Sequence, residues 1–179
     1  MKRSYTTLLL SIIMLLSLCG CSFESKPSET EIYIEQLNNE LAAFAQCAND
    51  FSDSLAQISD TSTVPSETEL DAIDANISDL SEICARLQSM KAPNEYADAA
   101  EALTNSMQKY TSALEKCSGL LDFYREFDSK IHEYKNPVTG SEELQKQAKE
   151  LYNKFALLMQ QATISFHNAQ DAFDTGKKQ

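Results

Sequence analysis

Apolar residues recur every three or four positions in four long stretches of this chain, and a proline stands near the start of each stretch. The four prolines are Pro27, Pro65, Pro93 and Pro137. The three-four spacing places apolar side chains on one face of an α-helix, and proline is tolerated in the first turn of a helix but disrupts its interior. The sequence therefore predicts four amphipathic helices that bury their apolar faces against one another.

The expected helix bounds follow from the apolar stripes and from capping signals. A serine followed three residues later by glutamate, the capping-box pattern, occurs at Ser28 and again at Ser66. Gly119 lies within the third stripe, where it predicts either a bend or a close packing contact. The linker 136–140, with the sequence NPVTG, separates the third helix from the fourth. We expect the four helices over about 28–59, 66–91, 93–134 and 141–175.

The connections between these helices are short, which favours antiparallel neighbours. We therefore predict an all-α fold, an antiparallel up-down-up-down four-helix bundle over 28–175 with long amphipathic helices, preceded by a signal peptide. Two long hairpins that pack over only part of their length are the alternative. At 1.5 Å per residue the third helix spans about 60 Å and the second about 40 Å. A tip formed by residues 120–150 should therefore extend past the first hairpin.

This tip is rich in aromatic residues, and two interpretations of them stay open. They could cap the end of the bundle, or they could form a partner-binding surface, because aromatic side chains dominate interface energetics. The residues of the predicted binding surface are Phe123, Tyr124, Phe127 and Tyr134.

The N-terminal 20 residues have the pattern of a signal peptide. Lys2 and Arg3 precede an apolar run over residues 8–18. This run is too short to remain in a membrane as a spanning helix, which needs about 20 residues. It has the length of the apolar core of a signal peptide. A plain secretory signal is one interpretation of it.

The end of the run has a more specific pattern, Leu18-Cys19-Gly20-Cys21. It resembles the bacterial lipobox, in which an apolar residue lies three before, and a small residue one before, the cysteine that is modified. Cys19 is the departure, since that position is more commonly small or aliphatic. The resemblance implies a lipid on the Cys21 thiol and cleavage between Gly20 and Cys21, so that residues 21–27 become a tether. It also implies a bacterial protein anchored by lipid to the extracytoplasmic face of a cell membrane, with inner or outer membrane left open.

The chain is acidic, with a formal net charge of −12. Removal of residues 1–20 takes away two basic and no acidic residues, which leaves 13 basic and 27 acidic residues and a net charge of −14. Such a surface repels nucleic acid and anionic lipid headgroups. Nucleic acid is therefore not an expected partner, and attachment to the membrane would come from the lipid.

Three cysteines would remain besides Cys19 and the lipidated Cys21. Cys84 and Cys117 lie on apolar stripes and Cys47 borders one, and a buried free cysteine behaves as a small hydrophobic residue. Their expected heights along the bundle differ by at least about 9 Å, which exceeds the Cα separation that a disulfide tolerates. We therefore predict no internal disulfide.

Recognised catalytic, haem and metal motifs are missing from the sequence. The two histidines, His132 and His167, lie in different helices, and neither has the glutamate three residues before it that di-iron bundles use. We therefore predict a non-enzymatic module, without catalytic residues, metal or cofactor, that binds a partner protein or small molecule outside the membrane. The alternative function is a metal- or haem-handling bundle, with Met107 or Met159 beside His167 as the candidate ligands.

Overall fold

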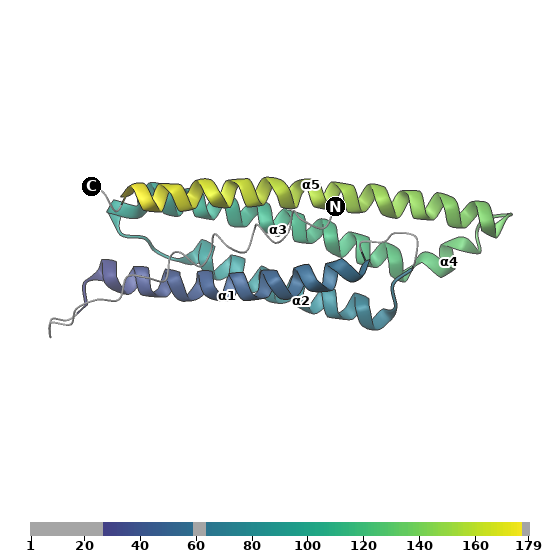
Figure 1. The fold of residues 1–179 in the computed structure, drawn as a ribbon, viewed down its shortest axis with the longest axis horizontal. Coiled ribbons are helices and arrows are strands. Elements are labelled where there is room, and N and C mark those ends of the chain that lie inside the picture. Colours follow the sequence, from purple (N-terminus) through teal and green to yellow (C-terminus); the bar gives the residue numbers. More distant parts are fainter. Residues whose placement is uncertain (1–26, 59–63, 177–179) are drawn as a thin grey trace.

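The computed structural model describes residues 27–58 and 64–176, and these residues form helices and connections with no β-strand among them. The helices are α1 (Glu29–Ile58), α2 (Glu67–Ser89), the short 3₁₀ helix η2 (Asn94–Tyr96), α3 (Ala97–Arg125), α4 (Phe127–Ile131) and α5 (Pro137–Gly176). Figure 1 shows α1, α2, α3 and α5 side by side along one long axis. The prediction of an all-α antiparallel bundle is confirmed.

Both predicted capping boxes are present. The Ser28 N–H donates to Glu31 Oε2 at 2.7 Å, and the Glu31 N–H donates to Ser28 Oγ at 3.2 Å. Likewise, the Ser66 N–H donates to Glu69 Oε2 at 2.7 Å, and the Glu69 N–H donates to Ser66 Oγ at 3.4 Å. These bonds hold the pKa of each carboxyl below its ordinary value, chiefly through the Ser28 N–H for Glu31 and the Ser66 hydroxyl for Glu69. Each box satisfies N–H groups that the first turn of a helix leaves unpaired.

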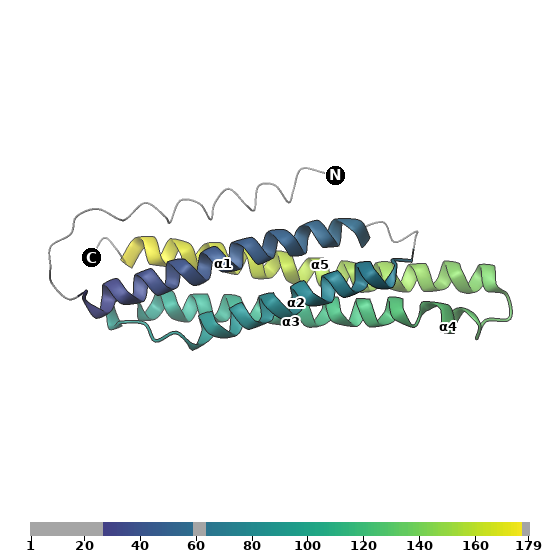
Figure 2. The same ribbon diagram turned by 90° about the horizontal axis from the view of Figure 1, so that it is seen from below.

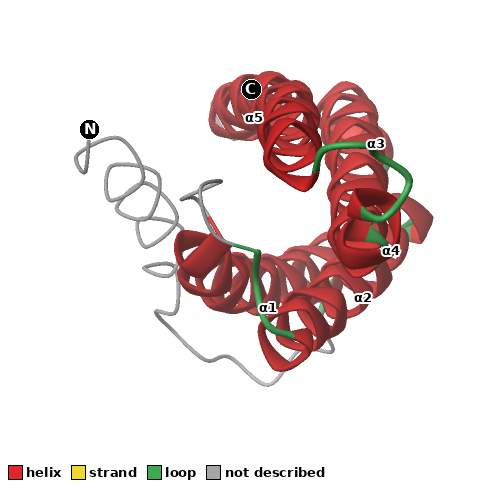
Figure 3. Cartoon of the chain, turned by 90° about the vertical axis from the view of Figure 1, so that its right-hand side faces the viewer, coloured by secondary structure: helices red, strands yellow, loops and turns green. Residues whose placement is uncertain are grey.

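The helices pair as two hairpins. α1 packs against α2, α3 packs against α5, and α2 packs against α3. The end-on view in Figure 3 shows the four long helices as an open arc, with α1 and α5 at its two ends. Ring contacts join these ends: Phe44 lies 5.6 Å from Phe166, and Phe51 lies 6.1 Å from Phe155, between ring centroids. One hydrophobic core therefore runs along the long axis between the hairpins.

The longest interface joins α3 to α5, and small residues let the two helices approach closely. On α3 the buried residues Ala99, Ser106 and Ala113 are seven positions apart, as are Ala162 and Ala169 on α5. The Ser106 hydroxyl donates to the Ala162 carbonyl at 3.3 Å. Because residues seven apart lie on one face of a helix, these side chains form a narrow seam along the hairpin.

The third predicted helix, 93–134, is divided in the structure, so the single helix is wrong. Backbone hydrogen bonds continue on both sides of the division, from Glu126 N–H to Asp122 O at 3.1 Å and from Lys130 N–H to Glu126 O at 3.0 Å. The chain therefore kinks between α3 and α4 without forming a loop. At this kink Arg125 is held by carboxylates of α2, while Phe127 turns into the core.

Gly119 does not cause this kink. It lies inside α3, it is exposed, and a Cβ added to it would meet nothing within 4 Å. The prediction of a bend or a close contact at Gly119 is therefore wrong.

The linker predicted at 136–140 is also wrong, because α5 begins at Pro137. Asn136 caps this helix: its Oδ1 accepts from the Val138 N–H at 3.0 Å, and its carbonyl accepts from the Gly140 N–H at 3.0 Å. A proline fits the first turn of a helix, where its missing N–H costs no intrahelical bond. The connection between α4 and α5 therefore lies within residues 132–136.

The predicted overhang is present. Figure 2 shows α4 and the first turns of α5 extending beyond the ends of α1 and α2. We call this part, residues 127–144, the tip. The end of the bundle where α1 begins and α5 ends is called the base.

Candidate functional site

Three of the four rings predicted to form a contact surface within residues 120–150 are buried. Phe123, Tyr124 and Phe127 expose only 9%, 3% and 3% of their surface. The Phe123 ring lies 6.4 Å from that of Tyr124 and 6.2 Å from that of Phe127, and Lys130 Nζ lies 5.0 Å from its centroid. The prediction that these three rings form an exposed binding surface is therefore wrong. Their burial is what the alternative, an aromatic cap on the end of the bundle, requires.

The fourth ring, Tyr134, packs against the start of α5. A Cβ added to Gly140 would lie 2.7 Å from Tyr134 Cγ, so glycine is needed there to let the ring approach the helix. The tip does expose Val138, which retains 68% of its surface.

A shallow groove of about 600 Å³ runs between α3 and α5. Lys109 Nζ donates to Ser165 Oγ across it at 3.2 Å. No carboxylate lines the groove, although the chain as a whole is acidic. The lining residues are amides, hydroxyls, one amine and two apolar side chains: Ala102, Asn105, Gln108, Lys109, Ser112, Leu158, Gln161, Ser165 and Asn168.

Two exposed apolar residues stand beside this groove. Leu157 and Ile164 each retain 56% of their surface, and each directly precedes a lining residue of α5. The apolar stripes of the sequence do not predict this groove, because most of the side chains that line it are polar. The available signal was the lack of acidic residues on α3 between Glu101 and Glu115.

Arg125 forms the densest set of ion pairs among the described residues. Its Nε lies 3.1 Å from Glu67 Oε1, and its Nη2 lies 3.0 Å from Asp71 Oδ1 and 3.1 Å from Asp74 Oδ2. Arg125 is the last residue of α3, and the three acidic residues lie in the first turns of α2. This cluster therefore connects the two hairpins next to the kink. We assign it a structural role.

The three cysteines of the described chain are free, and the prediction of no disulfide among them is confirmed. Burial raises the pKa of Cys84 and of Cys117 to about 12. Cys47 is half-buried, and burial raises the pKa of its thiol as well. Since the thiolate is the reactive form, these thiols act as packing groups.

Two of the candidate metal ligands, Met107 and His167, differ in their exposure to solvent. The described residues contain no group of three or more His, Cys, Asp or Glu side chains that could hold a metal ion. His167 is exposed, and its Nδ1 lies 2.9 Å from the Thr163 carbonyl, whereas Met107 is fully buried. Within the described ranges, no helix has the length and apolar character needed to cross a bilayer.

The residues of the predicted signal peptide and anchor, Gly20 and Cys21 among them, lie outside the described residues. Comparison of the chain with models of protein families, with curated proteins and with solved structures finds no match.

Proposed function

We propose that this chain is a bacterial lipoprotein whose helical bundle is held at the extracytoplasmic face of a cell membrane and serves as a non-enzymatic interaction module. The observation that carries the proposal is the N-terminal run that ends Leu18-Cys19-Gly20-Cys21, directly before a polar tether. A cysteine that carries two or more acyl chains is a stable anchor, whereas one chain would be marginal.

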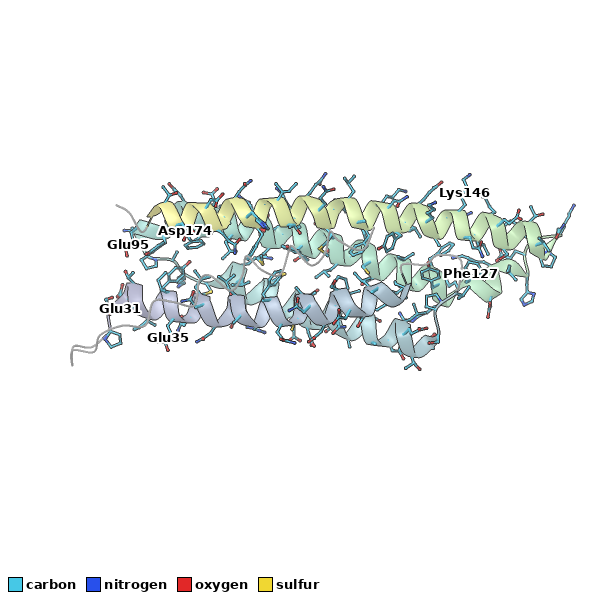
Figure 4. All side chains as sticks on the ribbon, viewed as in Figure 1. Glu31, Glu35, Glu95, Phe127, Lys146 and Asp174 are labelled. Carbon is cyan, nitrogen blue, oxygen red and sulfur yellow. The ribbon has the colours of Figure 1, made fainter. Side chains whose placement is uncertain are left out.

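The arrangement of the helices supports an orientation in which the base faces the membrane and the tip points away from it. Figure 4 shows Glu31 and Asp174, near the start of α1 and the end of α5, at one end of the molecule, and Phe127 at the other. The base is tied together across helices: Thr30 Oγ1 donates to Glu95 Oε1 at 2.7 Å, and the rings of Tyr33 and Tyr96 lie 6.1 Å apart. A lipid on Cys21 would therefore hold the base near the membrane and leave the tip far from it.

The groups with displaced pKa values support a module without acid-base chemistry. Besides the two buried thiols, Tyr110 has its pKa raised to about 12 by burial, and its hydroxyl is paired with Thr163 Oγ1 at 3.2 Å. These groups stay neutral at physiological pH and fill the core. A general acid or base would instead need a pKa near the working pH.

The anchor is tested by metabolic labelling with a fatty acid in a bacterial host. Wild-type chain and the variant Cys19→Ala should incorporate the label and be processed, whereas Cys21→Ala should lose the label and remain a precursor. Because Cys19→Ala removes a neighbouring thiol, it is the matched control for Cys21→Ala. Labelling that survives the loss of Cys21 would show that the anchor is assigned wrongly.

A further inference from the structure

Charged residues are divided unequally between the two hairpins. α1 carries six acidic residues and no basic one, and the only basic residue of α2 is Arg86. Arg86 is already paired with Glu40 at 3.0 Å. The exposed side of α1, with Asp50 and Asp53, therefore presents carboxylates without cations of its own hairpin to neutralise them.

Lysines gather along the groove between α3 and α5. Lys109 lines the groove, and Lys116 lies on the same face of α3, seven residues further on. On α5, Lys154 stands seven residues before the lining residue Gln161. Lys116 and Lys154 are both exposed, and in the described part of the chain neither forms an ion pair. The surface along the groove therefore carries the positive charge that α1 lacks.

The carboxylates of α1 and Lys154 lie at the same level along the bundle. Asp50 directly precedes Phe51, and Lys154 directly precedes Phe155. The rings of Phe51 and Phe155 are 6.1 Å apart, which places their two helices in register at this level.

Lys116 reaches a similar level from α3. The contact of Lys109 with Ser165 aligns α3 and α5, which run in opposite directions. Seven residues further along α3 correspond to about 10 Å, which brings Lys116 opposite Leu158 and within about a turn of Lys154. In Figure 3, α1 and the α3–α5 pair lie on different sides of the molecule, so the two surfaces cannot meet within one copy.

We propose that α1 of one copy of this chain docks into the α3–α5 groove of a second copy, with Asp50 and Asp53 facing Lys116 and Lys154. The proposal rests on the proposed function in one respect: a lipid tether would hold all copies the same way up and at the same height, so that surfaces at one level meet. Each docked copy leaves its other surface free, so the contact is head to tail and builds rows of parallel bundles.

A helix suits the groove because of the apolar residues beside it. Leu157 and Ile164 are seven residues apart, which matches one face of a helix lying alongside α5. A symmetric contact of α5 with α5 of a second copy, centred on these two residues, would place Glu150 opposite Asp171. Two such like-charge pairs disfavour the symmetric contact.

The test is cross-linking with a carbodiimide, which joins a carboxylate to a lysine amine as an amide with loss of water. Full-length processed protein is reconstituted into phosphatidylcholine vesicles as an equal mixture of ¹⁴N- and ¹⁵N-labelled copies. We expect mixed-isotope peptides that join Asp50 or Asp53 to Lys116 or Lys154. The mixed isotopes prove that the bond joins two copies.

Charge reversal then tests specificity. The variants Lys116→Glu/Lys154→Glu and Asp50→Lys/Asp53→Lys should each lose this cross-link completely when present alone, because the first lacks the amines that react and the second lacks the carboxylates. An equal mixture of the two variants should regain it, since each supplies the surface that the other lacks. The control Lys146→Glu/Lys149→Glu makes the same change of charge elsewhere on α5 and should cross-link like wild type.

Three results would overturn the docking: no mixed-isotope cross-link, Lys154 joined to Glu150 or Asp171 of another copy, or no rescue on mixing. The mass of the N-terminal peptide in the same sample reports the lipid separately. If Cys21 carries none, the proposed function fails, and the mixing experiment repeated with concentrated protein in solution decides the docking alone.

Discussion

The two hairpins of this bundle differ in how they are packed and in what they expose. α3 and α5 meet along a seam of small residues, and their hairpin extends beyond the first one through α4 and the first turns of α5, as Figure 2 shows. α1 and α2 together carry twelve acidic residues and one basic residue, whereas α3, α4 and α5 carry ten acidic and seven basic residues. We call the pair α1 and α2 the short hairpin, and the pair α3 and α5, with α4, the long hairpin. The long hairpin therefore sets the length of the molecule, and the short hairpin supplies most of its net negative charge.

The difference also shows how the hairpins are joined. α2 reaches α3 through the Arg125 cluster and through buried aliphatic side chains, while α1 reaches α5 through aromatic rings. Removing a ring should loosen the short hairpin, and filling the seam should disturb the long one.

The largest effect is expected from Phe44→Ala. The Phe44 ring lies 5.0 Å from that of Tyr110 and 5.6 Å from that of Phe166, and its side chain is 2% exposed. Loss of a fully buried phenylalanine costs about 3–5 kcal/mol of the free energy of unfolding, which urea denaturation followed by circular dichroism would measure. Ile32→Ala on the exposed face of α1 is the control and should change it by less than about 0.5 kcal/mol.

The seam of the long hairpin is tested by Ala162→Leu. Ala162 is fully buried, and its carbonyl accepts from Ser106, so a larger side chain must push α3 and α5 apart. Overpacking of this kind costs about 1–3 kcal/mol. Ala42→Leu, at an exposed position of α1, adds the same atoms without crowding. Equal stability of the two variants would show that the seam is not closely packed.

Stability should fall above pH 9 because of the thiols where the hairpins meet, Cys84 on α2 and Cys117 on α3. Folding raises both pKa values from 9.0 to about 12, so between these values the unfolded chain releases protons that the folded chain keeps. Their contribution is therefore complete below pH 9 and is lost as the pH rises. From pH 9 to 10 the two thiols together should cost about 2 kcal/mol, and Cys84→Ala should halve that dependence in urea melts.

The smallest effects concern the two glycines of the long hairpin, which should respond in opposite directions. Gly119→Ala should raise the free energy of unfolding by about 1 kcal/mol, because alanine fits an open helical position better. Gly140→Ala should lower it, because the added Cβ would collide with Tyr134. Thermal melting of the two variants compares them directly, and stabilisation by Gly140→Ala would contradict the packing described at the tip.

The apolar stripes were sufficient to predict α1 and α2 closely. Leu70, Ile73 and Ile77, three or four residues apart on α2, are all buried, and both predicted capping boxes form. These features depend on residues within one turn of each other. Local sequence therefore determines them.

The features that the sequence analysis missed depend on residues far apart in the chain. The kink after Arg125 involves ion pairs with α2, and the early start of α5 at Pro137 leaves Gly140 beneath Tyr134. The small buried residues Ala99 and Ala113 of α3 form part of the seam with α5. Alanine and serine contribute little to an apolar pattern, so a seam built from them is hard to predict from the sequence, although it is evident in the structure.

The most direct test of the proposed tethered bundle is the height of the tip above the membrane. A dye on Thr139→Cys at the tip, or on Thr175→Cys at the base, would transfer energy to acceptor lipids in vesicles carrying the lipidated chain, in a Cys47→Ala background. Thr139 and Thr175 are separated by about 54 Å along α5. We predict strong transfer from the base and weak transfer from the tip. Equal transfer from both positions would mean that the bundle lies flat on the membrane, and would contradict the orientation proposed here.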